Sequence, residues 1–139
     1  MDLYAFLNPV QPEEEKEIIV SDRFRDRDGN VIPFKIRSLS QNELDDIVRR
    51  SRKVKMIKGQ RVESVDPLEV SNRIVVAATI QPPFDDKTLC DHYGVLDPVS
   101  VPGKMLRPGE FNKLLDAISA LSGYDEDAIE RTEEDVKNS

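Results

Sequence analysis

The run Ile74-Val75-Val76-Ala77-Ala78-Thr79-Ile80 is the longest apolar stretch of the chain, and it decides how the rest must pack. Asp66-Pro67 precedes it with residues typical of a helix start, an N-cap aspartate and a proline at the first helical position. Pro82-Pro83 stops the helix behind it. Because the second half of this helix is apolar almost all round, we expect it to be the central buried helix. The run is seven residues long, far too short to span a bilayer.

A second helix is predicted upstream of this run. Ser40 followed by Glu43 has the spacing of a capping box, which marks a helix start. The apolar face then follows at helical spacing through Leu44, Ile47, Val48, Ser51 and Val54. We expect the loop Lys58-Gly59-Gln60 to end this helix.

This second helix coincides with a strongly basic segment. Residues 47–62 contain seven bases and no acid, namely Arg49, Arg50, Arg52, Lys53, Lys55, Lys58 and Arg61. At about 100° per residue, four of them lie opposite the apolar face. These four are the candidate binding residues Arg49, Arg50, Arg52 and Lys53.

Two functions fit a basic helical face. It could follow the phosphates of a nucleic acid. However, Asp45 and Asp46 stand four residues before Arg49 and Arg50, an order that suits the helix dipole and i,i+4 ion pairs. No Phe, Tyr or Trp lies between residues 35 and 83 to stack on bases. We therefore favour a solvated or protein-binding face and keep nucleic-acid binding as the alternative.

Further upstream, the hydrophobic period changes from helical to alternating. Residues 17–24 are rich in β-branched and aromatic side chains, and residues 31–37 alternate Ile32, Phe34 and Ile36 with polar residues or proline. The segment 26–30 between them contains an Asp-Gly turn signal. The pattern predicts an N-terminal β-hairpin with Ile32, Phe34 and Ile36 on its core face and an open edge at Pro33, which cannot donate to a ladder.

Downstream, two more helices are expected. One runs from Asp85 or Asp86 to Tyr93 and ends at Gly94. The other begins at Pro108 and ends at Gly123. Its apolar face is formed by Phe111, Leu114, Leu115, Ile118 and Leu121. Residues 95–107 contain Pro98, Pro102 and Gly103, so this segment is expected to be irregular.

The fold class predicted from these patterns is α+β, a mostly helical single domain over residues 1–139. We divide it into an N-terminal arm and hairpin (1–37), a helical core (38–123) and an acidic tail (124–139). The tail has seven acids and two bases and few apolar side chains, so it is expected to be a helix at most, to bury little and to fray. The arm holds an apolar cluster, Leu3, Tyr4, Phe6 and Leu7, which is a candidate partner-binding surface.

Composition argues against catalysis and cofactor binding. The 139 residues include one Cys, one His and no Trp, so a metal cage or a disulfide framework has too few ligands. Cys90 and His92 lie two residues apart on a predicted helix, where their side chains point in different directions. We predict a buried cysteine and a surface histidine, no enzyme activity, no cofactor and no metal site.

The sequence also predicts a compartment. The N-terminal residues lack the basic start and long apolar run of a secretory signal, and a lone cysteine suits a reducing environment. We expect a cytoplasmic protein without a membrane segment.

Several sequence blocks follow one another in a fixed order. The hairpin region contributes Ser21-Asp22-Arg23-Phe24, the turn 26–30 and Phe34-Lys35-Ile36-Arg37. The later blocks are residues 89–95, 105–111 and 123–127, followed by an acidic helical end. Together these blocks cover nearly the whole chain and resemble one family, the XkdN-like phage tail assembly chaperones. The segment 95–104 departs from this family, which is expected to be more helical there.

The resemblance implies a non-catalytic chaperone of a phage or prophage tail. Such a protein binds the tape measure protein and promotes assembly of the tail tube around it. The tail tube protein and other copies of the chain are two further candidate partners. It is expected in the cytoplasm of the bacterial host and absent from the mature virion.

Two other functions stay open at this stage. One is a small nucleic-acid-binding regulator that uses the basic segment 49–61. The other is a structural component of the tail. The candidate contact surfaces are the arm, the open edge of the hairpin and the basic face.

Overall fold

The structure of the protein, a computed structural model, describes residues 1–11 and 14–138. The predicted region 1–37 therefore includes two positions, 12 and 13, that lie outside the described residues, and the tail ends one residue beyond them. The described helices and strands, in chain order, are α1 (Tyr4–Leu7), β1 (Glu15–Ile18), β2 (Phe34–Arg37), α2 (Gln41–Arg50), β3 (Arg52–Ile57), β4 (Gln60–Val65), α3 (Pro67–Ala78), β5 (Thr79–Gln81), α4 (Lys87–Tyr93), the 3-10 helix η1 (Pro98–Ser100), α5 (Val101–Met105), α6 (Pro108–Ser122) and α7 (Glu126–Lys137). The predicted fold class, a mostly helical α+β domain, is confirmed.

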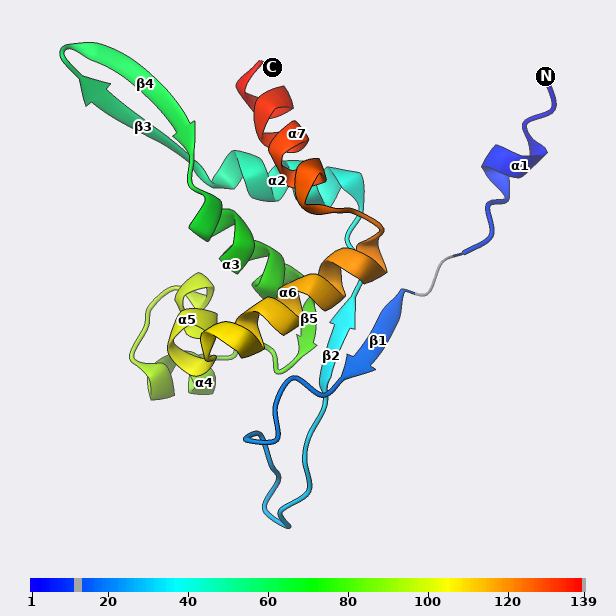
Figure 1. Cartoon of the computed structure of the whole chain (residues 1–139), viewed down its shortest axis with the longest axis vertical. Helices are drawn as coiled ribbons and strands as arrows, with labels where there is room; N and C mark the ends of the chain where they lie inside the picture. The colour runs from blue at the N-terminus through cyan, green and yellow to red at the C-terminus, as the bar shows by residue number, and fades with distance from the viewer. Residues whose placement is uncertain (12–13, 139) are drawn as a thin grey trace.

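The core is built around α3, as predicted. The Asp66 carboxylate caps the helix by accepting from the backbone N–H groups of Leu68 (3.0 Å) and Glu69 (3.4 Å). In its second half, Ile74 and Val75 have no exposed surface. The other core elements surround it in Figure 1, with α6 crossing in front and α2 at one end.

The end of α3 differs from the prediction. The helix stops at Ala78, and Thr79–Gln81 continues as strand β5. Thr79 and Ile80 are β-branched and Gln81 directly precedes Pro82, so the three residues suit an extended backbone. The apolar run therefore serves two elements, a buried helix and a strand that pairs with β2.

The predicted N-terminal hairpin is confirmed, but β1 begins at Glu15 and shares only residues 17 and 18 with the predicted strand 17–24, and β2 is shorter than predicted. β1 pairs antiparallel with β2, from Glu15 opposite Arg37 to Ile18 opposite Phe34. Phe34 is buried and packs edge-on against Phe24, with ring centroids 5.2 Å apart. The predicted core residue Ile32 is only half-buried and lies outside the strand.

The tip of this hairpin is the predicted turn. The Asp26 carboxylate accepts from the backbone N–H groups of Asp28 and Asn30, both at 2.9 Å, and these bonds lower the pKa of Asp26. Gly29 has a φ of 85°, which glycine adopts without strain.

The expectation of an open edge at Pro33 is wrong. β2 is the central strand of a three-stranded sheet in the order β1-β2-β5. Pro33 precedes β2, so its missing N–H does not interrupt the ladder, and its carbonyl accepts from the Gln81 side chain at 2.8 Å. The outer edges of the described sheet belong to β1 and β5.

Helix α2 begins as predicted but is shorter. Ser40 and Glu43 form the capping box, each side chain accepting from the other residue's backbone N–H at 3.2 Å. Ser51 ends the helix, and its buried hydroxyl donates to the Ile47 carbonyl at 2.8 Å. Residues 52–65 then form an antiparallel hairpin, β3–β4, where a helix continuing to residue 58 was predicted.

The turn of the second hairpin explains the difference. Lys58 and Gly59 have φ angles of 52° and 77°, and two positive φ angles in a two-residue loop define the tight turn that suits the twist of paired strands. Val54, placed on a helical core face by the sequence pattern, is half exposed on β3.

The helices after residue 85 combine confirmed and corrected predictions. α4 is capped by Asp86 and ends at Gly94 (φ 68°), and α6 ends at Gly123 (φ 77°), both as predicted. The segment 95–107 is not irregular, because η1 and α5 occupy it and bury Val101 and Met105.

The acidic tail forms a helix, which the sequence analysis considered, but more of its side chains are buried than predicted. Thr132 and Val136 of α7 are 4% and 2% exposed. They face inward where α7 packs on α2 and touches β4 (Figure 1). The tail is therefore docked on the domain.

One partly buried ion pair ties the first hairpin to the helices. Arg23 donates to both oxygens of Glu110, from Nε at 2.9 Å and from Nη2 at 2.6 Å, and Nη2 also reaches the Met105 carbonyl at 3.1 Å. The Glu110 side chain is 10% exposed. The hydrogen bonds from Arg23 lower the pKa of Glu110 to about 2.

We predict that Glu110→Gln lowers the free energy of unfolding at neutral pH by about 1.5–3 kcal/mol, because a charge-assisted, two-point contact is lost. The folded pKa, about 2, lies below the ordinary 4.5. The stabilisation is therefore complete above the ordinary value and disappears as the pH falls through the folded one. Denaturant titrations across this window should show the wild type losing its advantage over the variant.

The matched control is Glu17→Gln, at an exposed glutamate of β1. Its pH dependence should follow that of the wild type. Equal pH dependence for wild type and Glu110→Gln would contradict a stabilising Arg23–Glu110 pair.

Candidate functional site

The N-terminal arm presents its predicted apolar cluster to solvent. Leu3, Tyr4, Phe6 and Leu7 are between 52% and 75% exposed. The short helix α1 is held at one end by the Asp2 carboxylate, which accepts from the Tyr4 N–H at 2.9 Å. Figure 1 shows α1 standing apart from the body, so its apolar side chains contribute to no core there.

A second projecting element is the β3–β4 hairpin (residues 52–65). Figure 1 shows it extending from the body beside α7. Directly paired residues of an antiparallel ladder share a face, so Val54 and Met56 lie on one face and Ile57 and Val62 on the other. All four are at least 39% exposed. The sequence pattern did not identify this surface.

A local signal for this hairpin was present. Val54 and Met56 alternate with lysines, and Lys58-Gly59 is compatible with a tight turn. The same Val54 also continues the helical spacing of Leu44, Ile47 and Ser51, and that pattern was given more weight.

The four predicted basic residues do not form one helical face. Arg49 and Arg50 occupy the last turn of α2, while Arg52 and Lys53 lie on β3. Consecutive strand residues point to opposite faces, so these two diverge. The prediction of a continuous basic helical face is wrong, because α2 ends at Arg50.

Most of these bases have acidic partners. Arg50 pairs with Asp46 at 3.0 Å, and Arg52 with Glu63 at 3.7 Å. Lys53 lies 3.3 Å from Asp66 and 3.6 Å from Glu69. The hydrogen bond to Asp66 raises the pKa of Lys53 and lowers that of Asp66.

Three bases of the segment have no acidic partner in the described part of the chain and are therefore available to an external partner. Arg49, Lys55 and Lys58 form no ion pair within the described residues, and all three are exposed. They lie on three different elements: the end of α2, β3 and the turn. This spacing gives no continuous track for a phosphate backbone, which weakens the nucleic-acid alternative.

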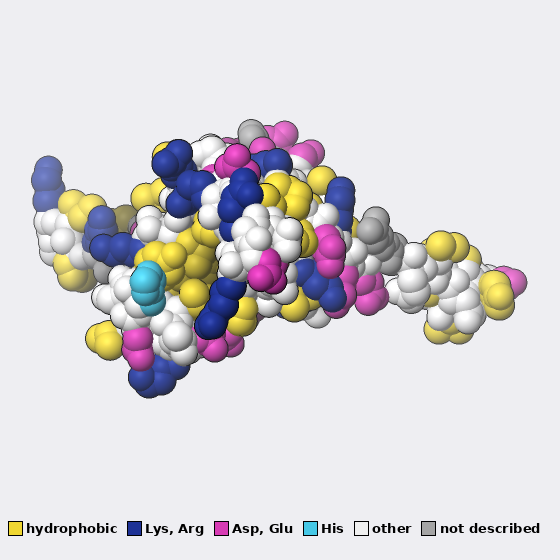
Figure 2. Space-filling view, turned by 90° about the horizontal axis from the view of Figure 1, so that it is seen from below, with side chains coloured by type: hydrophobic (Ala, Val, Ile, Leu, Met, Phe, Trp, Pro, Cys, Tyr) yellow, Lys and Arg dark blue, Asp and Glu magenta, His cyan; other side chains and the backbone are white. Residues whose placement is uncertain are grey.

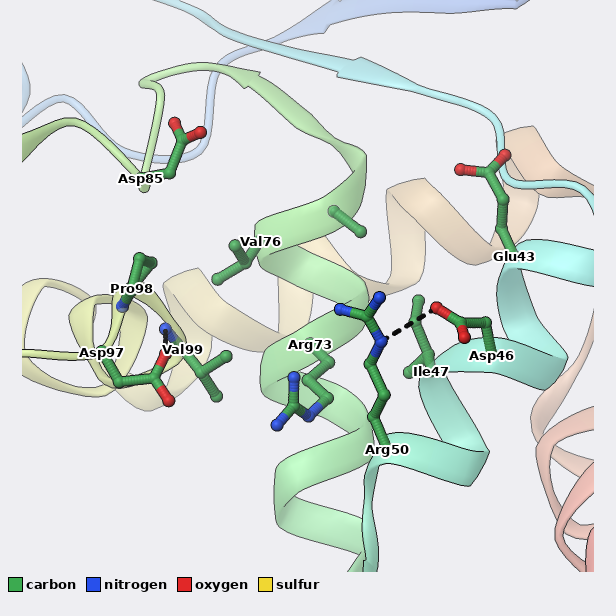
Figure 3. A pocket seen from close by; sticks show the side chains of 11 residues that line it. Glu43, Asp46, Ile47, Arg50, Arg73, Val76, Asp85, Asp97, Pro98 and Val99 are labelled. Atoms are coloured by element: carbon green, nitrogen blue, oxygen red, sulfur yellow. Dashed lines mark hydrogen bonds and ion pairs between the residues drawn. The ribbon is translucent and has the colours of Figure 1, made fainter.

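An open groove of about 340 Å³ runs over α3 between α2 and the segment that contains Asp85 and η1 (Figure 3). Three of its four carboxylates have structural roles. Asp97 caps η1 through a 3.0 Å bond from the Val99 N–H, Asp46 pairs with Arg50, and Glu43 pairs with Arg37 at 2.6 Å. The Arg37 contact lowers the pKa of Glu43. These side chains stabilise helix ends and neighbouring elements.

An apolar cavity of about 260 Å³ opens on the face shown in Figure 2, near the single histidine. Its lining includes Phe24, Pro33, Leu89 and Tyr93. Cys90 is buried and His92 is exposed, as predicted, and the His92 ring stacks edge-on against Tyr93.

Residues 1–11 and 14–138 contain no cluster of three His, Cys, Asp or Glu side chains placed to hold a metal ion. No helix in this part of the chain has the length and apolar character needed to cross a bilayer.

Comparison with known proteins assigns the family. Residues 3–137 match the family described as Phage XkdN-like tail assembly chaperone protein, TAC. The chain belongs to the XkdN-like tail assembly chaperones. It is 34% identical over 127 residues to the phage-like element PBSX protein XkdN of Bacillus subtilis, covering 90% of this chain and 85% of XkdN. The family predicted from the ordered blocks is confirmed.

Two further similarities support the fold. The uncharacterised protein YqbN of Bacillus subtilis is 35% identical over 127 residues, with the same coverage of 90% and 85%. The crystal structure of YqbN is similar with a TM-score of 0.72 and 29% identity, over 90% of this chain and 98% of that one.

We predict that Lys58→Asn stabilises the β3–β4 hairpin by about 0.5–1 kcal/mol, because asparagine tolerates the left-handed backbone better than lysine does. The hairpin projects from the core, so the effect should appear as slower amide hydrogen exchange in residues 52–65. The control Lys55→Asn, within a strand, should not slow exchange. Unchanged or faster exchange in Lys58→Asn would contradict the turn geometry.

Proposed function

We propose that this tail assembly chaperone binds the tape measure protein of its phage tail and promotes assembly of the tail tube around it. It acts in the cytoplasm of the bacterial host, without catalysis, and is absent from the mature virion. The family membership supports the role in tail assembly, and the exposed arm supports a protein-binding role.

The observation that carries the proposal is the arm. Single exposed apolar side chains are normal on a protein surface, but exposed clusters of large apolar side chains mark interaction sites. Full burial of one such side chain is worth about 1.5–3 kcal/mol. Three of them on the short helix α1, with Leu3 directly before it, can therefore supply much of the binding energy for a partner.

The partner that suits this surface is a long amphipathic helix. Such a helix has apolar stripes that aggregate when they are not covered. Packing α1 onto a stripe removes apolar surface of both proteins from water, in the manner of a helix-in-groove contact. Release of the chaperone when tail tube subunits enclose the tape measure protein then explains the expected absence from the virion.

The direct test is co-expression of this chain with the tape measure protein of the same tail. We expect the tape measure protein to stay soluble and to co-purify with the chain. A tape measure protein that is equally soluble without the chain, and does not co-purify with it, would contradict the proposal. Mass spectrometry of purified particles should find no copies of this chain.

We predict that Phe6→Asp/Leu7→Asp weakens binding of the tape measure protein at least about tenfold, since two apolar contacts are lost. The fold should be unaffected, because both side chains are exposed. Isothermal titration calorimetry or pull-down titration measures the effect.

The matched control is Val10→Asp, which changes an exposed apolar residue of the same arm outside α1. It should bind nearly as the wild type does. Equal binding by wild type and the double variant would show that α1 is not the contact surface.

A further inference from the structure

We propose that the β3–β4 hairpin of one copy of the chain packs against helix α7 of a second copy. The hairpin combines exposed apolar side chains with unpaired positive charge, and α7 carries the opposite charge. This contact between copies does not depend on the proposed binding of the tape measure protein.

The hairpin has a surplus of positive charge. Residues 52–65 contain five bases and one acid, a net charge of +4. Glu63 is shared by Arg52 and Arg61, at 3.7 and 3.2 Å. Lys55 and Lys58 find no acidic partner among the described residues; Lys55 shares its strand face with the exposed Ile57 and Val62, and Lys58 lies in the turn that follows. The surface therefore fits an acidic protein surface with some apolar area.

Pairing of two hairpins with each other is disfavoured. A two-stranded sheet has open edges that could join edge to edge. Each hairpin is strongly positive, and lysines on an exposed strand prevent such pairing by repulsion. The surface that binds the hairpin must therefore carry negative charge.

Helix α7 has the complementary charge. Residues 126–137 contain six acids and two bases, a net charge of −4. Asp127, Glu130 and Glu134 are exposed and lie within about 60° of one another around the helix, opposite the buried Thr132 and Val136. None of these three acids forms an ion pair within the described chain. The pKa of neighbouring Glu133 is raised, mainly by burial and then by the charge of Glu130, while Lys137 lowers it.

The placement of the two surfaces allows a reciprocal contact. Figure 1 shows the hairpin and α7 at the same end of the molecule, with the hairpin tip pointing away from the body. Two copies related by a two-fold axis can therefore each place a hairpin on the other's α7, as in an isologous dimer.

The test is the mass of the purified chain in solution. Sedimentation equilibrium should show the 15.8 kDa chain associating to a dimer as its concentration rises, and the dimer should weaken as salt increases from about 50 to about 500 mM. Lys55→Glu/Lys58→Glu and Glu130→Lys/Glu134→Lys should each raise the dissociation constant at least about tenfold. Circular dichroism checks that both variants fold.

Mixing the two variants gives the decisive result. Each hairpin then faces an α7 of opposite charge again, so an equimolar mixture should form a heterodimer of nearly wild-type affinity. The control Lys104→Glu/Lys113→Glu makes the same charge change at exposed lysines of α5 and α6 and should dimerise like the wild type.

Three results would overturn the proposal. The first is a monomeric wild type at all concentrations, and the second is a dimer that both charge-reversed variants retain. The third is binding of a short DNA or RNA by the hairpin of a monomeric chain, which would identify the occupant as a nucleic acid.

Discussion

Burial of the second half of α3 is the constraint on which the rest of the structure depends. Ile74, Val75 and Ala78 have no exposed surface, and covering them requires elements from both ends of the chain. Strand β2 contributes Ile36 and α6 contributes Leu114 and Ile118, all with no exposed surface. Because these elements are used in the core, α1 and the β3–β4 hairpin are left outside it. Their exposed apolar side chains are then free for partners.

Local signals were sufficient where a helix end is determined by its own residues. Asp66-Pro67, Gly94 and Gly123 act through the adjacent backbone, and each ends or starts a helix where the sequence predicts. Contacts between elements that are distant in the sequence determined the structure of the segments that were predicted wrongly. Thr79 and Ile80 become a strand because β2 lies alongside. The burial of Val136 depends on α2, which is some 90 residues earlier in the sequence.

The candidate surfaces were predicted in part. The arm was found from composition, because Leu3, Tyr4, Phe6 and Leu7 lie together before a polar stretch and need no tertiary context to be recognised. The hairpin could not be separated from a longer helix, since Ser51 and Val54 fit both periodicities. Its charge was predicted correctly and its geometry was not. The result is a chain whose positive and negative excesses lie on two neighbouring elements, β3–β4 and α7.

The central claim is that apolar surface left outside the α3 core serves as the contact surface for the tape measure protein. Amide hydrogen exchange of the chain, alone and in complex with that protein, tests it most directly. We expect residues 3–7 to exchange rapidly in the free chain and to become protected in the complex, while α3 stays protected in both. Unchanged exchange in residues 3–7, with new protection confined to other parts of the chain, would contradict the account.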